Sequence, residues 1–467
     1  MSRLAPARGT DHAALLRQAL ADHDAGRVPL IGDERWSAEH WSAVVAAAHA
    51  KLAELDGMDH DDDAPAWAAF TSGSTGSPKV VLRSQCSWTR GFDVVDDWVR
   101  PRPDDVLLAP VHPVSSMTVF AVAWAQRAGV DWRVPAAGAV RASDLAGVTL
   151  VHATPHRVAE ILDLLDAGPS DDGPLASGPS DAAPHRLRHL LVGGDRLTPG
   201  LRERAAAHGI ALSHYYGAAE LSLVAVDHDG TGLRLVDGVA ARVCTAREVA
   251  EPLATNKTPA TPKTPATAET LDPSEAAHAL VSAPGVLELR TAQAALGLPI
   301  QPGGWVSAGD RATLMPDPDG ASVRLELHGR EDSAVLTAGA TVIPAEVEAA
   351  TLALRDDAGD PLVTGAFVCG RPAPRIGSLL CIYLEPGPAF RRRADDTHAA
   401  AHERTAALVR HLRDAWAEQL PTAARPRLVH VGDALARTAS GKVVRDAATQ
   451  DALTRRVTET CERSGRA

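Results

Sequence analysis

The chain has 467 residues, of which 45% are hydrophobic, and a formal net charge of -12. It is long enough for two or more hydrophobic cores. Because the net charge is negative, the chain has no overall positive charge to attract phosphates, and we expect no nucleic-acid partner. The five cysteines form no CxxC pair, which disfavours a zinc site or a disulfide framework and favours reduced thiols.

The N-terminal stretch MSRLAPARGTDHAALLRQAL mixes charges with apolar residues and lacks the apolar core of a signal peptide. Residues 106–125 carry no Asp, Glu, Lys or Arg and match a membrane span in length. However, they include His112, two prolines and two serines. We therefore predict a buried strand, turn and helix here, no membrane span, and a cytoplasmic protein.

Two segments are predicted to be surface insertions. Residues 168–184 repeat GPSD, and the segment near 251–275 contains repeats of KTPAT. Both are rich in Pro, Ser, Thr and Ala and have few large apolar side chains to offset the entropy of ordering. Surface loops tolerate such insertions well.

The pattern of the remaining chain is α/β. Residues 187–194 and 210–217 are predicted strands on either side of a helix at 199–209, an order that favours a parallel sheet. After residue 328 we predict a hairpin, a helix opened by Pro344, two strands and a long helix over 397–419. The fold class is thus a large α/β N-terminal domain (1–328) with mixed or parallel sheets, a hinge near 329–332, and a small α+β domain (333–467).

The stretch AAFTSGSTGSPKVVL at 68–82 combines flexible glycines, hydroxyl groups and one cation. Backbone N–H groups, hydroxyl donors and a lysine on one loop suit the phosphates of a nucleotide. It is not a Walker A loop, because Pro78 precedes Lys79 and Val80 follows it. The predicted phosphate-binding residues are Thr71, Ser72, Gly73, Ser74, Thr75, Gly76 and Lys79.

This stretch resembles the phosphate loop of the adenylate-forming superfamily, which includes acyl-CoA synthetases, carrier-protein adenylation domains and luciferases. Four further stretches resemble motifs of that superfamily and follow in the same order along the chain. They are YYGAAE (215–220), GWVSAGD (304–310), GREDSAVLTAGATVIPAEVE (329–348) and RTASGKVVR (437–445). Five ordered motifs between residues 70 and 445 make the resemblance specific.

The resemblance implies a set of roles for individual residues. Glu220 would hold Mg²⁺ that bridges nucleotide oxygens and would contribute to catalysis. The adenine ring would stack on Tyr216, beside Gly217. The ATP site would also include Gly194, Asp195, Asp310 and Arg330, the last two at the ribose.

Other implied roles concern the acyl group and the moving domain. Lys442 would contact the carboxylate and α-phosphate during adenylation, and neutralise charge in the transition state. Asp332 falls on the hinge position, and Gly339 would line the tunnel for the thiol. His112 and Gly193 would border the acyl pocket, although a histidine satisfied within the core is an equal reading of His112.

The sequence departs from the family pattern in several places. Ala219 and Ala308 replace threonines that are usual there, and the phosphate loop begins after only about seventy residues. We therefore expect an abbreviated N-terminal part and weaker phosphate contacts. None of these changes removes a charged catalytic group.

The sequence thus predicts an AMP-forming acid–thiol ligase. It would convert a carboxylic acid and ATP to an acyl-adenylate with Mg²⁺, then form a thioester with CoA. Loading of a separate carrier protein is the first alternative, because no carrier domain is expected after residue 445. A non-catalytic nucleotide-binding relative is the second. Fatty and aryl acids both stay open as substrates.

Overall fold

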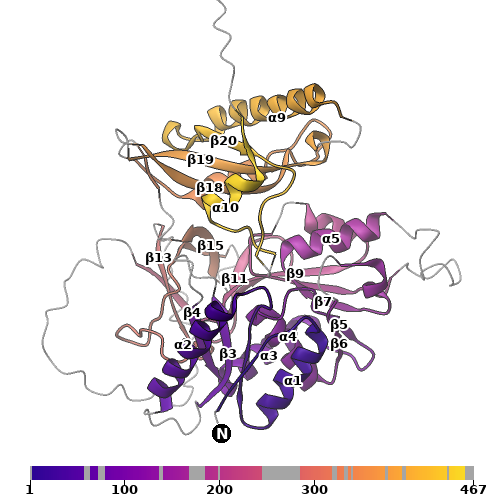
Figure 1. Ribbon diagram of the computed structural model, residues 1–467, viewed down its shortest axis with the longest axis vertical. Coiled ribbons are helices and arrows are strands. Elements are labelled where there is room, and N and C mark those ends of the chain that lie inside the picture. Colours follow the sequence, from indigo (N-terminus) through magenta and orange to yellow (C-terminus); the bar gives the residue numbers. More distant parts are fainter. Residues whose placement is uncertain are drawn as a thin grey trace, which may run out of the picture. The chain divides into compact units, whose positions relative to one another are not determined.

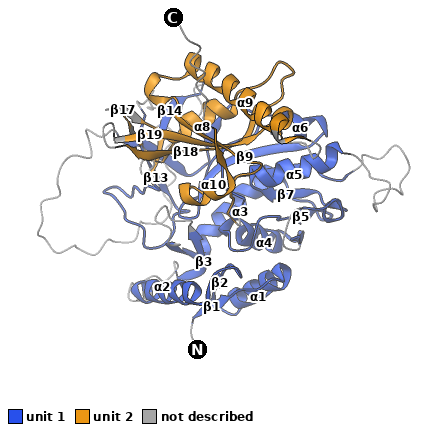
Figure 2. Cartoon of the chain, turned by 45° about the horizontal axis from the view of Figure 1, so that its top comes forward, with its two compact units in different colours: residues 1–308, 312–326, 439–442 blue, residues 309–311, 327–438, 443–467 orange. Residues whose placement is uncertain are grey.

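The structure is a computed structural model that describes residues 3–56, 64–71, 79–135, 140–167, 185–197, 200–244, 284–317, 323–330, 335–337, 340–373, 377–391, 396–438 and 441–457. The chain divides into two compact units (Figure 2). The large unit comprises residues 1–308, 312–326 and 439–442, and the small unit comprises 309–311, 327–438 and 443–467. Both predicted insertions, 168–184 and 251–275, lie outside the described residues.

The largest sheet has eleven strands, several of which are labelled in Figure 1. Their spatial order is β12 (Val239–Cys244), β13 (Gly285–Thr291), β14 (Asp310–Pro316), β15 (Val323–Arg330), β11 (Leu233–Leu235), β10 (Ser222–Asp227), β9 (Ala211–Ala218), β8 (His189–Val192), β7 (Leu150–Ala153), β5 (Val106–Leu108) and β6 (Asp131–Arg133). Strands β6, β5, β7, β8 and β9 pair in parallel, whereas β9, β10, β11 and β15 pair antiparallel. The predicted mixed α/β architecture is confirmed.

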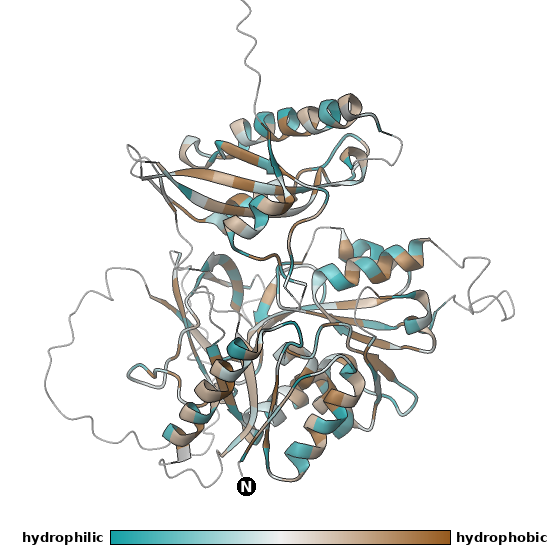
Figure 3. Cartoon of the chain, in the orientation of Figure 1, coloured by the Kyte–Doolittle hydropathy of each residue, from teal (hydrophilic) through white to brown (hydrophobic). Residues whose placement is uncertain are grey.

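Both faces of the parallel strands are buried. Leu191 faces a core built with α1 (His12–Asp24), α3 (Gln85–Val99) and α4 (Ser116–Ala128). Its neighbour Leu190 faces a second core built with α5 (Pro155–Asp166) and α6 (Leu201–Ala207). Successive side chains of a strand point to opposite faces of the sheet. A strand that is buried on both faces therefore needs apolar residues at nearly every position. Figure 3 shows the hydrophobic colouring of these strands and the mixed colouring of α1 and α5.

The predicted strand, helix and strand between residues 187 and 217 are confirmed as β8, α6 and β9. Val192 of β8 is the parallel register partner of His214 in β9. The carboxyl end of β8 therefore lies beside β9, at the end of the parallel strands where ligands bind in α/β sheets.

Residues 106–125 form the predicted buried strand, turn and helix, as β5 and most of α4. Ala121, Val122 and Ala125 of α4 are almost completely buried against the sheet. Among the described residues, no helix is both long and apolar enough to cross a membrane. The apolar run thus reflects burial on a sheet.

The N-terminal residues form two small sheets. One pairs β1 (Leu4–Ala7) with β2 (Val28–Ile31) in parallel, and the other pairs β3 (Pro65–Thr71) with β4 (Lys79–Ser84) antiparallel. Helix α2 (Ala38–Asp56) contributes Ala48 and Leu52 to a core with both sheets. Strands β3 and β4 of the second sheet lie on either side of the predicted phosphate segment in the sequence.

The small unit is built on a six-stranded sheet. Its strands are β16 (Val335–Thr337), β17 (Ala340–Val342), β18 (Val363–Ala373), β19 (Gly377–Pro386), β20 (Leu428–Val431) and β21 (Arg455–Arg456). Helices α8 (Pro344–Leu352) and α9 (His398–Gln419) pack on one face through a core that includes Ile382 of β19 and Trp416 of α9. The predicted hairpin, helix, two strands and long helix are all present.

The opposite face of this sheet carries a smaller cluster with a pair of cysteines. Cys369 of β18 is the direct antiparallel register partner of Cys381 in β19. Cys381 is fully buried, and Cys369 is half-buried. Leu435 and Val443 pack in the same cluster, so the segments on either side of residues 439–442 lie against this face.

Candidate functional site

The carboxyl ends of β8 and β9 bring several predicted residues together in the large unit. Gly193, Gly194 and Asp195 directly follow β8, and Tyr216 lies two residues beyond His214, the last partner of β8 in β9. The His214 ring contacts the carbonyl of Asp195 at 3.1 Å, which joins the two chain segments. Gly194 has a φ of +84°, a conformation that glycine adopts without strain.

The turn after β9 carries Glu220. Gly217 lies so close to the next strand that a Cβ there would be 2.2 Å from the carbonyl oxygen of Ser222. Ser222 itself has a φ of +59°, which is uncommon for a residue with a side chain. The carbonyl of Glu220 accepts the N–H of Ala295 at 2.7 Å. A tight turn and one long-range hydrogen bond thus fix the backbone at Glu220.

Arg83 of β4 is a buried cation that the sequence analysis did not single out. Its side chain is 1% exposed, and its Nη1 donates to the carbonyl of Ala219 at 2.5 Å. Its Nη2 donates to the carbonyl of Gln293. Burial lowers the pKa of Arg83 to about 9, while the charge of Glu220 opposes that shift. The available signal was an arginine inside the apolar run KVVLRS.

The ends of the predicted phosphate segment are fixed side by side, because Thr71 and Lys79 are register partners in β3 and β4. The residues from Ser72 to Gly76 lie outside the described part of the chain. Lys51 of α2 donates to the carbonyl of Val80 at 2.9 Å. Burial and then the charge of Lys79 lower the pKa of Lys51. A second lysine therefore lies within electrostatic reach of Lys79.

Gly193 lies directly beneath an aromatic ring. A Cβ on Gly193 would be 2.2 Å from the ring of Tyr215, so only glycine allows this contact. The hydroxyl of Tyr215 is 2.8 Å from Nε2 of His152, and both side chains are buried. Burial raises the pKa of Tyr215 and lowers the pKa of His152 to about 3. Both groups are therefore neutral near pH 7.

Residues 439–442 group with the large unit. A Cβ on Gly194 would be 3.3 Å from Cε of Lys442 and 3.1 Å from Cε of Met117. A Cβ on Gly441 would be 3.1 Å from the hydroxyl oxygen of Thr154. Lys442 and Gly194, two of the predicted site residues, therefore lie close together.

Asp310 and Arg330 belong to the small unit. Asp310 begins β14, Arg330 ends β15, and these two strands are neighbours in the sheet. A Cβ on Gly309 would be 3.5 Å from a guanidinium nitrogen of Arg330. The two predicted ribose ligands therefore start from adjoining strand ends. Asp332 and Gly339 lie outside the described residues.

His112 is held in a cluster with two residues that are distant in sequence. Its Nε2 lies 2.9 Å from Oε2 of Glu34, and its Nδ1 accepts the N–H of Val114 at 3.1 Å. Nε2 of His12 is 3.9 Å from the same Glu34 oxygen. These three residues could offer ligand atoms to a metal ion.

The hydrogen bonds of His112 do not fit a metal site. A histidine that binds a metal normally donates from its other ring nitrogen. Nδ1 of His112 instead accepts a backbone N–H, so Nε2 carries the proton and donates it to Glu34. We interpret the cluster as a hydrogen-bonded pair beside a neutral histidine, since burial lowers the pKa of His12.

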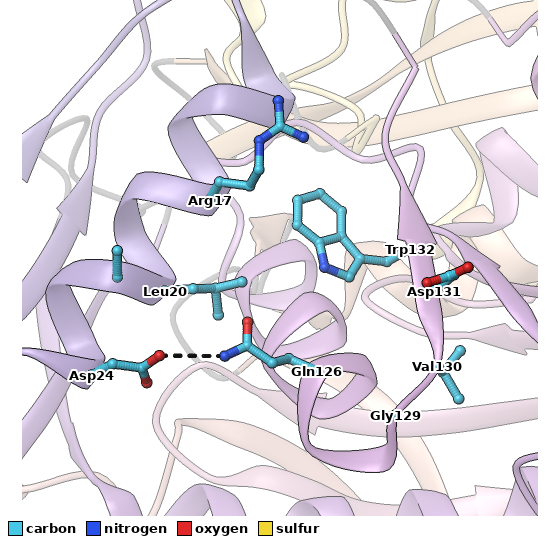
Figure 4. Close-up of a pocket in the computed structure, with 9 residues that line it drawn as sticks. Arg17, Leu20, Asp24, Gln126, Gly129, Val130, Asp131 and Trp132 are labelled. Atoms are coloured by element: carbon cyan, nitrogen blue, oxygen red, sulfur yellow. Dashed lines mark hydrogen bonds between the residues drawn. The ribbon is translucent and has the colours of Figure 1, made fainter. Parts of the chain in front are cut away.

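A separate hollow of about 620 Å³ lies between α1 and the segment from α4 to β6 (Figure 4). Arg17, Trp132 and Asp131 line it, and Gln126 donates to Asp24 across one end at 3.4 Å. None of the predicted site residues lines this hollow. It is therefore distinct from the strand ends described above.

The chain matches a known enzyme family over its N-terminal part. The sequence model of the family described as AMP-binding enzyme matches residues 4–262, which is more than half of the chain. The matched residues include the phosphate segment and the ends of β8 and β9.

Solved structures share the fold at low sequence identity. ATP-bound MatB from Rhodopseudomonas palustris is 18% identical, with a TM-score of 0.66 over 95% of this chain and 87% of that one. The o-succinylbenzoate CoA synthetase MenE from Bacillus subtilis, with its acyl-adenylate, is 16% identical, with a TM-score of 0.66 over 97% and 89%. The anthranilate CoA ligase AuaEII, with anthranoyl-AMP, is 17% identical, with a TM-score of 0.58 over 94% and 76%.

A curated relative matches part of the sequence. Phosphinothricin tripeptide synthetase PhsB from Streptomyces viridochromogenes is 30% identical over 177 residues. The match covers 34% of this chain and only 13% of that protein. The similarity thus spans about a third of this chain and a small part of PhsB.

Proposed function

We propose that this chain, which belongs to the AMP-binding enzyme family, activates a carboxylic acid with ATP. Its motifs resemble those of the adenylate-forming superfamily, whose members catalyse this reaction. The products would be an acyl-adenylate and pyrophosphate, and the acyl group would then pass to the thiol of CoA. The observation that carries this proposal is the closeness of Lys442 to Gly194 just after β8, with Tyr216 and Glu220 in and just after the neighbouring strand β9.

The residues take roles that follow from their chemistry. Tyr216 would stack on adenine. Lys442, near Gly194, would neutralise charge that develops between the carboxylate and the α-phosphate. Asp310 and Arg330 would bind the ribose hydroxyls through charge-assisted hydrogen bonds. The hinge at Asp332 and the thiol tunnel at Gly339 stay predictions.

Glu220 is the residue that would hold Mg²⁺. It offers one half-buried carboxylate, and Mg²⁺ is commonly bound by one or two carboxylates together with substrate phosphates. The charge of Glu220 acts on both Arg83 and Lys51, so two cations lie within electrostatic reach of this carboxylate. When bound, the ion would neutralise phosphate charge during displacement of pyrophosphate.

CoA is favoured as the acceptor by structural neighbours that cover nearly the whole chain, two of which are named as a CoA synthetase and a CoA ligase. The partial match to a tripeptide synthetase favours the alternative, transfer to a phosphopantetheine carrier protein. Both acceptors present the same thiol arm, so their relative rates of acylation separate them.

The proposed function is tested in two half-reactions. We expect ATP–pyrophosphate exchange that depends on an added carboxylic acid and on Mg²⁺. We then expect an acyl-CoA product, detected by mass spectrometry. Thioester formation on a carrier protein at rates far above those with saturating CoA would establish the alternative acceptor. ATP binding without exchange for any acid would instead establish a non-catalytic nucleotide-binding relative.

A further inference from the structure

The facing cysteines of the small unit are thiols that take no part in the proposed function. Cys369 of β18 and Cys381 of β19 are register partners, and both are free. The next register pair on this face, Phe367 and Tyr383, stacks with ring centroids 5.6 Å apart. Cys381 lies in the buried cluster that holds both rings, and Cys369 packs against that cluster. The two thiols therefore lie on the same face of the sheet, side by side.

A polar network beside the pair favours a thiolate. The guanidinium of Arg371 donates to the hydroxyl of Tyr383 at 2.5 Å and pairs with the carboxylate of Asp451. A hydrogen bond from Cys369 is the strongest influence that lowers the pKa of Cys381, and hydrogen bonds from the same tyrosine and arginine add to it, while burial opposes the shift. The hydrogen bond to Cys381 raises the pKa of Cys369. The proton of the pair is therefore held between the two sulfurs.

Small oxidants are the reagents that this pair can meet. Cys381 has no exposed surface, whereas Cys369 is half-buried, so solvent reaches the pair at Cys369. A thiolate is the nucleophile in thiol oxidation, and Cys369 becomes one when its proton passes to Cys381 along their hydrogen bond. A peroxide needs contact with only one sulfur atom, which suits a site with so little exposed sulfur.

The pair lies beneath the loop that carries Lys442. Leu435 belongs to the same buried cluster as Cys381, and Val443 packs against that cluster. The two ends of the loop are joined, because the N–H of Val444 donates to the carbonyl of Ala436 at 2.8 Å. Lys442 directly precedes Val443, so a shift in the packing of Val443 displaces Lys442 as well.

We propose that Cys369 and Cys381 form a reversible disulfide when a peroxide oxidises them, and that this modification slows adenylation. The second part rests on the proposed function, in which Lys442 serves the adenylation step. A disulfide draws the two sulfurs together, and the side chains of Leu435 and Val443 must repack over them because protein interiors are close-packed. Lys442 then loses its position relative to the reacting groups.

The oxidation balances with one molecule of hydrogen peroxide. The sulfur of Cys369 attacks one peroxide oxygen, the O–O bond breaks, and Cys369 becomes a sulfenic acid. Its thiol proton, released through Cys381, leaves with the departing hydroxide as water. The sulfur of Cys381 then attacks the sulfur of Cys369, the S–O bond breaks, and the second hydroxide leaves as water with the proton of Cys381. The two thiols are oxidised to a disulfide, and the peroxide is reduced to water.

The test treats the reduced protein with hydrogen peroxide and follows two readouts. Peptide mapping without reductant is expected to find Cys369 joined to Cys381. ATP–pyrophosphate exchange, measured with the acid that the reduced protein uses best, is expected to fall by about ten- to a hundredfold, because a misplacement of about 1 Å can cost about a hundredfold in rate. Dithiothreitol is expected to reverse both changes. Reversal excludes oxidation of Met117, which lies near Gly194, because methionine sulfoxide requires a reductase.

Cys369→Ser removes one sulfur at a half-buried position, and we expect it to keep wild-type exchange before and after peroxide. Cys381→Ala carries the same expectation, and Cys369→Ser alone decides the question if Cys381→Ala does not fold. Cys86→Ser removes an exposed thiol of α3 and is the matched control, expected to respond as the wild type does. In Lys442→Ala, peroxide is expected to change the residual exchange by less than about twofold, because both changes act on one group.

The outcomes separate this inference from the proposed function. Absence of the joined peptides after peroxide would overturn the disulfide. Joined peptides with unchanged exchange, or an equal loss of exchange in Cys369→Ser, would overturn the effect on adenylation, and a full further loss in Lys442→Ala would overturn the route through Lys442. Absence of exchange with every acid in the reduced protein would overturn the proposed function and the effect on adenylation, while peptide mapping would still decide the disulfide.

Discussion

Arg83 and Ala219 are joined by a buried hydrogen bond of 2.5 Å that crosses from β4 to the turn before Glu220. The same guanidinium also binds the carbonyl of Gln293. One cation from the strand after the phosphate segment therefore holds two distant backbone segments, and it does so next to the proposed magnesium ligand.

The first prediction concerns this contact. Arg83→Met leaves two buried carbonyl groups without their donor, so we expect the free energy of unfolding to fall by about 2–5 kcal/mol. Urea denaturation measures the loss, and the KM for ATP is expected to rise because the turn at Glu220 loosens. Arg83→Lys retains the charge and is expected to lose less. Equal stability of Arg83→Met and the wild type would contradict a stabilising role for these two hydrogen bonds.

The second prediction concerns Lys442. Lys442→Ala is expected to slow acid-dependent pyrophosphate exchange by about a hundred- to a thousandfold, because one charge-stabilising group is lost from the transition state. Thioester formation from a supplied acyl-adenylate is expected to change little. Lys442→Arg keeps the charge and serves as the control. An equal loss of rate in both half-reactions would contradict the assignment of Lys442 to the adenylation step.

The third prediction concerns acid pH. Burial lowers the pKa of His189 from 6.5 to about 4, so the unfolded chain binds a proton between these values that the folded chain excludes. Stability is therefore complete above pH 6.5 and falls as the pH drops toward 4, with a contribution approaching about 1.4 kcal/mol per pH unit. We expect His189→Gln to have a shallower profile. His49→Gln, at an exposed position of α2, is the control, and the same slope in both variants would exclude His189 as the cause.

The fourth prediction concerns the segment between β12 and β13. Deletion of residues 255–268, outside the described part of the chain, is expected to change the free energy of unfolding by less than about 1 kcal/mol. The reason is that Cys244 and Val286 are register partners, so the ends of the segment already lie side by side. Gly285→Val is a contrasting variant, because its Cβ would be 2.5 Å from the carbonyl oxygen of Cys244. An insoluble deletion variant would show that the repeats are structural.

The sequence predicted those parts of the fold that depend on local pattern. The parallel unit of β8, α6 and β9 follows from two apolar strands, with a proline shortly before the helix and glycines near the element ends. The small unit is similar, since Pro344 opens α8 as expected. Membership of the AMP-binding family is also confirmed, because five motifs in order carry more information than any single one.

The remaining features depend on contacts between distant residues. Nothing local to Arg83 indicates that it binds carbonyls at Ala219 and Gln293. The partner of His112 is Glu34, 78 residues earlier in the chain. The contact between Tyr215 and Gly193 likewise depends on the register of two strands. Such contacts are set by tertiary packing, which local sequence patterns do not report.

The cysteine register in the small unit has a consequence for how the protein is handled and studied. Opposite Cα atoms in an antiparallel pair are about 4.5–5.5 Å apart, within the range that a disulfide spans. Cys369 and Cys381 are opposite one another, in the cluster that also holds Leu435 and Val443. A disulfide between them would therefore need little movement of the two strands, and a count of free thiols after aerobic storage shows whether the pair has been oxidised.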